Sequence, residues 1–210
     1  MSQETPTPGS GLIPPQSNDG SAVARAFEGM DSVLDRVAAE LYSFASMLVG
    51  EGEDAIHLVE TAVASAEVSA TGTKEARRSG RRALATAAVE LLAMRDSAAL
   101  AAPEGLERAV TCIEDDDLDA AAEAREAMER MIAGPDRDRV RAWLESLPTA
   151  MRTIYALRAV AGLTASETAD ILARHGGPRA AGWTPEAVRE LFRQALCSLA
   201  SQLIHATAGQ

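Results

Sequence analysis

Apolar residues recur three and four positions apart along most of this chain, and no stretch alternates apolar with polar residues as a half-buried strand does. This spacing places the apolar side chains on a single stripe of a helix. Aromatic residues make up only 3% of the sequence although the apolar fraction is 47%, so the chain offers little bulk for a β-sandwich or barrel. The sequence therefore predicts an all-α fold.

Three successive helical segments predict a compact domain over residues 26–100, because helices joined by short loops can cover one another's apolar faces. Glycines lie between these segments and predict where the helices end. The three predicted helices cover residues 27–48, 55–66 and 73–95. Residues 1–25 are rich in Pro, Gly, Ser and Thr and hold too few large apolar side chains to offset the entropy of ordering, so we expect a disordered tail.

The net charge of -11 is concentrated in the middle of the chain, where residues 101–139 carry five basic and twelve acidic side chains. We expect an acidic linker with a helix here, because acids stabilise the N-terminus of a helix. Pro103 can open a shorter helix that runs to Ile113. The acids from Asp115 also fit several positions of a calcium loop, but Ala120 stands where that loop needs Gly, which favours helix capping.

Residues 140–207 are predicted to form a second helical domain. Apolar stripes on both sides of Pro148 predict two helices, the second of which stops near Gly162. Trp143 lies on the first stripe, so a place in the core is favoured over a pocket.

Two caps predict where the last two helices begin. Thr164 and Glu167 have the spacing of a capping box, which starts a helix that runs to about residue 174. Thr184 is a good N-cap and Pro185 a good first helical residue, so the last helix begins there.

The order of these features resembles region 4 of sigma factors of the extracytoplasmic-function class, which has a Leu-Pro pair, an Arg, a Gly-Leu-Thr turn and a Glu-Ala helix. The resemblance implies a two-domain layout: a region 2-like three-helix unit over residues 26–100, an acidic helical linker over 101–139, and a region 4-like helix-turn-helix unit over 140–207. The matching residues are Leu147, Pro148, Arg152, Gly162, Leu163, Thr164, Glu167, Ala169 and Leu172.

Residues 54–67 are similar to the stretch with which that family grips the clamp of RNA polymerase. Asp54, Ala55, Leu58 and Val59 match the family pattern. Ile56, His57, Glu60 and Val63 do not. The resemblance implies that Asp54, Leu58 and Val59 contact RNA polymerase core or another protein partner.

Candidate DNA contacts fall in two groups. Phosphate binding needs cations, and a recognition helix presents its N-terminal residues to the major groove. The basic run of the third predicted helix rests on phosphates or is a solvated face that balances acidic neighbours, and the sequence leaves both alternatives open. The candidates are Lys74, Arg77, Arg78, Arg81 and Arg82 in that run, and Arg174, Arg179, Thr184, Arg189 and Arg193 near the last helix.

Three departures from the family weaken the expected DNA contact. Residues 45–142 contain no Phe, Tyr or Trp, although promoter melting needs aromatic side chains that stack on unpaired bases. Nine residues separate Arg174 from Thr184, where the family has about four. One interpretation is that this insert is a flexible arm whose Arg174, Arg179 and Trp183 touch DNA. We favour the other, that the insert alters the geometry in which the last helix would dock on DNA. The predicted outward face of the last helix also pairs two acids with two bases: its residues are Glu186, Arg189, Glu190, Arg193, Gln194 and Cys197.

The sequence holds no pattern of a catalytic or metal site. Cys112 and Cys197 lie far apart and outside any CxxC spacing, so we expect free thiols in a reducing cytosol, and the three histidines share no ligand spacing. No phosphate-binding loop or nucleophile pattern occurs, so neither an enzyme nor a cofactor is expected. The chain also lacks a signal peptide and a transmembrane run, which predicts a cytoplasmic protein without a membrane partner.

These features favour a divergent sigma-factor-like protein that acts in transcription by contacting RNA polymerase core, promoter DNA weakly, or both. The alternative is a sigma mimic that binds an anti-sigma factor or another protein and never touches DNA. A third hypothesis is a helical scaffold that reuses the fold.

Overall fold

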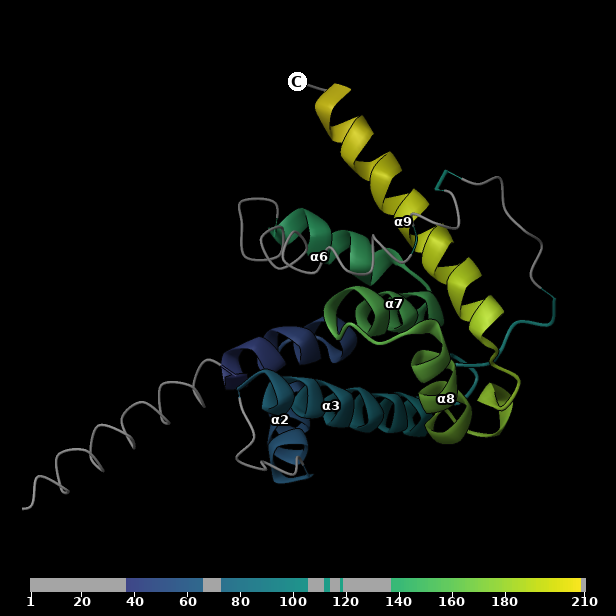
Figure 1. Cartoon of the computed structure of the whole chain (residues 1–210). Coiled ribbons are helices and arrows are strands. Elements are labelled where there is room, and N and C mark those ends of the chain that lie inside the picture. Colours follow the sequence, from purple (N-terminus) through teal and green to yellow (C-terminus); the bar gives the residue numbers. More distant parts are fainter. Residues whose placement is uncertain (1–36, 66–72, 106–111, 114–117, 119–136, 209–210) are drawn as a thin grey trace, which may run out of the picture. The chain divides into compact units, whose positions relative to one another are not determined.

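The computed structural model describes residues 37–65, 73–105, 112–113, 118 and 137–208 (Figure 1). Every regular element in these residues is a helix, and none is a strand, which confirms the predicted all-α class. The predicted tail lies outside the described residues. The predicted acidic helix also lies outside them apart from Leu118, which is helical and buried. The division into two domains stays a prediction.

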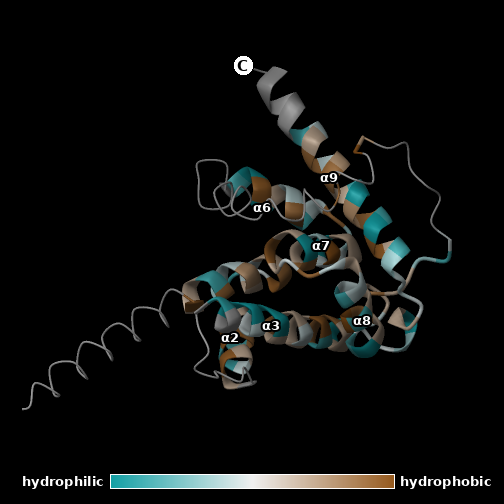
Figure 2. Cartoon of the chain, in the orientation of Figure 1, coloured by the Kyte–Doolittle hydropathy of each residue, from teal (hydrophilic) through white to brown (hydrophobic). Residues whose placement is uncertain are grey.

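The first described helices agree with the predicted ones. Residues 37–49 are helical and end at Gly50, whose φ of 88° is a left-handed conformation that glycine adopts without strain. They are followed by α2 (Glu53–Ser65) and α3 (Thr73–Arg95), which pack against each other. Figure 2 shows that α3 changes from hydrophilic to hydrophobic along its length, so its basic run and its apolar core contacts occupy different halves.

The segment after α3 differs from the prediction. Residues 101–105 are not helical, so the helix expected to open at Pro103 does not begin there. The backbone N–H of Ala102 donates to the carbonyl oxygen of Arg179 at 2.9 Å, which ties this non-helical segment to the connection that precedes Thr184. A tertiary hydrogen bond of this kind has no signature in the local sequence.

The second half of the chain begins with α6 (Arg137–Ser146) and α7 (Thr149–Tyr155), separated at Pro148 as predicted. A π-helical turn, η1 (Ala156–Val160), continues α7 and buries all five of its residues. It ends before Gly162, which has a φ of 70°. Then follow α8 (Ala165–His175), the short 3₁₀ helix η2 (Pro178–Ala180) and α9 (Pro185–Ala208).

Aromatic side chains fill the core between α6, α7 and α9. The rings of Trp143 and Tyr155 meet edge to face at 4.9 Å, and Tyr155 lies 6.1 Å from Phe192. The buried guanidinium of Arg158 stacks on Phe192 at 5.3 Å and donates to the carbonyl of Leu163 at 2.7 Å. The prediction that Trp143 is a core residue is confirmed.

Candidate DNA-binding and protein-binding surfaces

Both predicted caps of the α8 and α9 helices are present. The Thr164 hydroxyl accepts from the backbone N–H of Glu167 at 3.1 Å, and the Glu167 carboxylate accepts from the backbone N–H of Thr164 at 2.9 Å. The Thr164 N–H, together with Arg82 and Arg78, holds the pKa of Glu167 below its usual range. At α9, the Thr184 hydroxyl accepts from the N–H of Ala187 at 3.2 Å.

The long connection between α8 and α9 is docked onto the segment after α3. The indole N–H of Trp183 donates to the carbonyl of Leu100 at 2.9 Å, and Trp183 is buried. The flexible-arm interpretation, in which Trp183 touches DNA, is therefore wrong, because the indole is enclosed and hydrogen-bonded within the fold. Arg179 remains exposed, with its carbonyl bonded to Ala102.

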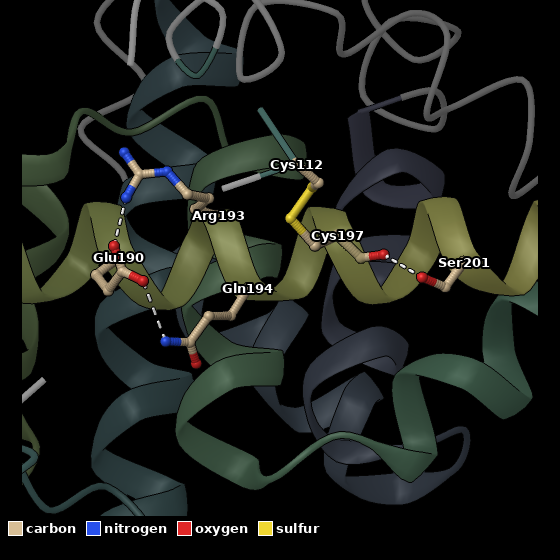
Figure 3. Close-up of a disulfide and its surroundings, with 6 residues drawn as sticks. All are labelled: Cys112, Glu190, Arg193, Gln194, Cys197 and Ser201. Atoms are coloured by element: carbon tan, nitrogen blue, oxygen red, sulfur yellow. Dashed lines mark hydrogen bonds and ion pairs between the residues drawn. A yellow bond between two sulfur atoms is a disulfide. The ribbon is translucent and has the colours of Figure 1, made fainter. Parts of the chain in front are cut away.

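The predicted outward face of α9 is only partly exposed. Glu186 and Arg189 face solvent, 3.7 Å apart. Glu190 and Arg193 are only 7% and 3% exposed and form an ion pair with each other, and Gln194 donates to Glu190 at 3.2 Å (Figure 3). The expectation that Glu190 and Arg193 face solvent is wrong, because α9 is covered on a second face in addition to its apolar stripe.

A disulfide joins Cys197, one turn beyond Arg193, to Cys112 (Figure 3). This corrects the expectation of two free thiols. The two residues lie 85 positions apart in sequence, yet the fold brings their Cα atoms to 5.7 Å, within the usual range for a disulfide. Ile113 beside Cys112 packs against the core, and Cys112 itself is exposed.

The basic run of α3 makes ion pairs within the molecule. Two of its arginines pair with Glu40 of the helix at residues 37–49: Arg77 at 3.1 Å and Arg81 at 3.2 Å. Arg78 and Arg82 pair with Glu167 of α8, at 3.7 and 2.8 Å. These pairs agree with the alternative in which the run balances acidic neighbours, although the sequence did not identify Glu40 and Glu167 as those neighbours.

The members of the run differ in exposure. Arg81 is buried, so it is not available for the phosphate contact suggested from the sequence, because Glu40 already pairs with it there. Arg78 and Lys74 are exposed, and in the described part of the chain Lys74 has no ion-pair partner.

The remaining candidate cations lie near the end of α8 and the start of α9. Arg174 is 72% exposed and lies 3.5 Å from Asp170, and Arg189 pairs with Glu186. Ion pairs this exposed contribute little stability, so both arginines are free to turn towards a phosphate.

The structure does not bring all candidate cations into one cluster. Arg82 of α3 pairs with Glu167 of α8. Eight residues further along each helix, Glu90 of α3 lies 2.7 Å from His175 of α8. Thus α3 and α8 run side by side in the same direction, and Arg174 lies roughly 10 Å along the helix axis from the Arg82 pair.

The α2 surface differs from the one expected from the sequence. Leu58 is 2% exposed and belongs to the core, so its predicted partner contact is wrong. Asp54 is exposed and paired with Arg95, and Val59 is half-buried. Two large apolar side chains of α2 that were not predicted to face solvent are exposed, Ile56 at 49% and Val63 at 44%.

Ile56, Val59 and Val63 lie at positions i, i+3 and i+7, which places them on one face of the helix. We call these three residues the α2 stripe. The sequence did indicate a second apolar face, because α2 carries apolar residues on two sides of the helix. Packing on the core accounts for only one of these two sides.

No family model, no curated protein and no solved structure matches this chain. The described residues include no helix that is long and apolar enough to cross a membrane. They also bring together no group of three or more His, Cys, Asp or Glu side chains that fits a metal ion.

Proposed function

We propose that this chain is a divergent sigma-factor-like transcription protein that acts by binding RNA polymerase core through α2. The observation that carries the proposal is the α2 stripe. Exposed apolar residues that gather on one helix face are typical of protein interaction sites, whereas single exposed apolar residues are not informative. The stripe lies in the segment that resembles the clamp-gripping stretch of sigma factors.

Charge supports a protein partner over a nucleic acid. Arg81 and Arg193 are buried in ion pairs, and Arg77, Arg78 and Arg82 have acidic partners on neighbouring helices. The exposed cations are the candidates for a weak, salt-dependent phosphate contact. These are Lys74, Arg174, Arg179 and Arg189.

Co-elution with purified core polymerase tests the proposal. We expect the full chain to co-elute, and Ile56→Asp to weaken binding by about tenfold or more, because a charge placed in an apolar contact must be desolvated. Met94→Asp is the matched control, since Met94 is 76% exposed on α3, outside the stripe. Failure of the wild-type chain to co-elute, or equal losses in both variants, would contradict the proposal.

A second candidate is a sigma mimic that binds an anti-sigma factor or another protein and does not bind DNA. It is favoured by the ion pairs that occupy the basic run of α3, which leave few cations for phosphates. In this case the α2 stripe would contact the anti-sigma factor.

Binding to duplex DNA at two salt concentrations separates the candidates. A protein that neutralises phosphates loses affinity steeply as salt rises. A steep loss that is reduced in Arg174→Ala supports promoter contact. Absence of binding at the lower salt concentration, together with co-elution with an anti-sigma domain and not with core, supports the mimic.

A further inference from the structure

We propose that the α2 stripe binds a basic amphipathic helix of its partner, in which lysine or arginine side chains lie beside the apolar ones. This inference rests on the proposed function, because both place a protein partner on Ile56, Val59 and Val63. It adds the chemistry of the partner surface, which the apolar side chains of the stripe do not specify by themselves.

Two acidic side chains border the α2 stripe. Glu53 lies three positions before Ile56, and Glu60 lies four positions after it and three before Val63, so each is a neighbour of the stripe on the helix surface. At about 100° per residue, both acids lie on the side of the stripe away from the buried Leu58. Both are exposed. One long edge of the stripe is therefore acidic, and the other turns towards the core.

These two acids are not neutralised within the described part of the chain. Asp54 pairs with Arg95 of α3, whereas Glu53 and Glu60 form no ion pair with any residue that the structure describes. The helix itself contains no Lys or Arg. The arginines of the basic run of α3, by contrast, have acidic partners on neighbouring helices. The stripe therefore combines exposed apolar surface with uncompensated negative charge.

The spacing of these residues fits a helix as the occupant. Ile56 and Val63 are seven residues apart, and so are Glu53 and Glu60, which places each pair roughly 10 Å apart along the helix axis. A partner helix that packs alongside α2 presents apolar side chains at the same seven-residue interval. Two cations about two turns apart on that helix can reach Glu53 and Glu60 together.

The same charges disfavour three other occupants. Nucleic acids and anionic membranes carry dense negative charge, which the acidic edge repels. A second copy of this chain is disfavoured by symmetry. The stripe is centred between Val59 and Glu60, so in a two-fold antiparallel pair of α2 helices the Glu60 side chains of both copies would approach each other. Like charges facing each other across an interface weaken binding.

Fluorescence anisotropy with two synthetic helical peptides tests the inference on the full chain. The peptides share one apolar face, and one carries Lys beside it where the other carries Glu. We expect Glu53→Gln/Glu60→Gln to weaken binding of the Lys peptide by about threefold to tenfold at low salt, and less at high salt, because exposed charge pairs are screened. The matched control is Glu104→Gln/Glu186→Gln, which removes the same charge from exposed positions outside α2 and should bind like wild type.

Charge reversal separates a lost contact from a damaged helix. Glu53→Lys/Glu60→Lys should gain affinity for the Glu peptide, which an unfolded α2 would not do. Equal affinity of wild type and Glu53→Gln/Glu60→Gln for the Lys peptide would overturn the inference. Equal losses in the two Gln variants would also overturn it, because the peptide would then sense only the net charge of the protein.

Co-elution with core polymerase distinguishes failure of the inference from failure of the proposed function. A wild-type chain that does not co-elute with core contradicts the proposed function, whereas the peptide measurements still decide the chemistry of the stripe. Co-elution that is lost in Ile56→Asp and unchanged in Glu53→Gln/Glu60→Gln at low salt would support the proposed function and overturn the basic partner.

Discussion

At the scale of single residues, Glu167 links local and tertiary structure. It completes the capping box of α8 and accepts ion pairs from Arg78 and Arg82 of α3. The same contacts lower its pKa, first of all the hydrogen bond from the Thr164 N–H. A carboxylate whose folded pKa is depressed stabilises the fold above the unfolded pKa, about 4.3 for Glu, and this contribution is lost as the pH falls through the folded value.

We therefore expect the stability difference between wild type and Glu167→Gln to be full at neutral pH and to shrink at acidic pH. Urea unfolding at a series of pH values measures it. Glu104→Gln serves as the control, because Glu104 is exposed at the end of the described segment that follows α3. A difference between wild type and Glu167→Gln that does not change with pH would contradict this account.

The hydroxyl of Thr164 gives a second prediction. Thr164→Ala removes the acceptor for the Glu167 N–H and should destabilise the protein by about 1 kcal/mol. Thr164→Ser keeps the acceptor and should lie within a few tenths of wild type. Equal losses in the two variants, measured by urea unfolding, would show that the methyl group and not the cap matters.

These caps could be predicted because both partners lie within three positions in the sequence. Other single-residue roles could not. Leu58, Arg81 and Arg193 were predicted to contact partners at the surface, and all three are buried, the two arginines in ion pairs. The disulfide is the extreme case, since no spacing rule connects Cys112 with Cys197.

At the scale of elements, the connection between α8 and α9 depends on a glycine with no room for a side chain. A Cβ at Gly176 would lie 2.6 Å from the Leu172 carbonyl oxygen and 2.7 Å from Ala180 Cβ. We expect Gly176→Ala to destabilise the protein by about 1–3 kcal/mol, because the backbone must move. Thermal or urea unfolding measures the loss.

Gly80→Ala is the matched control. Gly80 lies inside α3, where a Cβ would meet Leu41 at an ordinary contact distance of 3.4 Å. Alanine there should be neutral or stabilising by up to about 1 kcal/mol, owing to its higher helix propensity. Destabilisation of the same size in both variants would mean that crowding at Gly176 is not the cause.

The helices and their ends could be predicted from the spacing of the apolar residues, the N-caps, Pro148 and Gly50, because each of these acts within a few residues. The π-helical turn at Ala156–Val160 did not, because its residues form α-helix equally well and the local pattern is the same. Residues 101–105 are not helical although Pro103 suits a helix start, and the tertiary hydrogen bond between Ala102 and Arg179 in this segment is not indicated by the local sequence.

At the scale of the whole molecule, polar contacts join the parts that the sequence assigned to two domains. Arg141 of α6 pairs with Glu51 ahead of α2, and Arg82 of α3 pairs with Glu167 of α8. The buried Trp183–Leu100 hydrogen bond adds a neutral link. Such contacts need two distant segments at once, so neither the docked connection nor the occupied cations could be read from either segment alone.

The disulfide spans about as much of the sequence as these contacts, but it is covalent and so persists in the unfolded chain, and this sets the last prediction. Cys112 and Cys197 are 85 residues apart, so the bond restricts the unfolded chain strongly and should stabilise the oxidised protein by roughly 2–4 kcal/mol. Cys112→Ser and Cys197→Ser should lose this amount equally in urea unfolding, and reduced wild type should match both. Because α9 keeps its apolar stripe on the core, all three should still unfold in one cooperative transition. A loss of cooperativity would instead show that the second half of the chain needs the bond to fold.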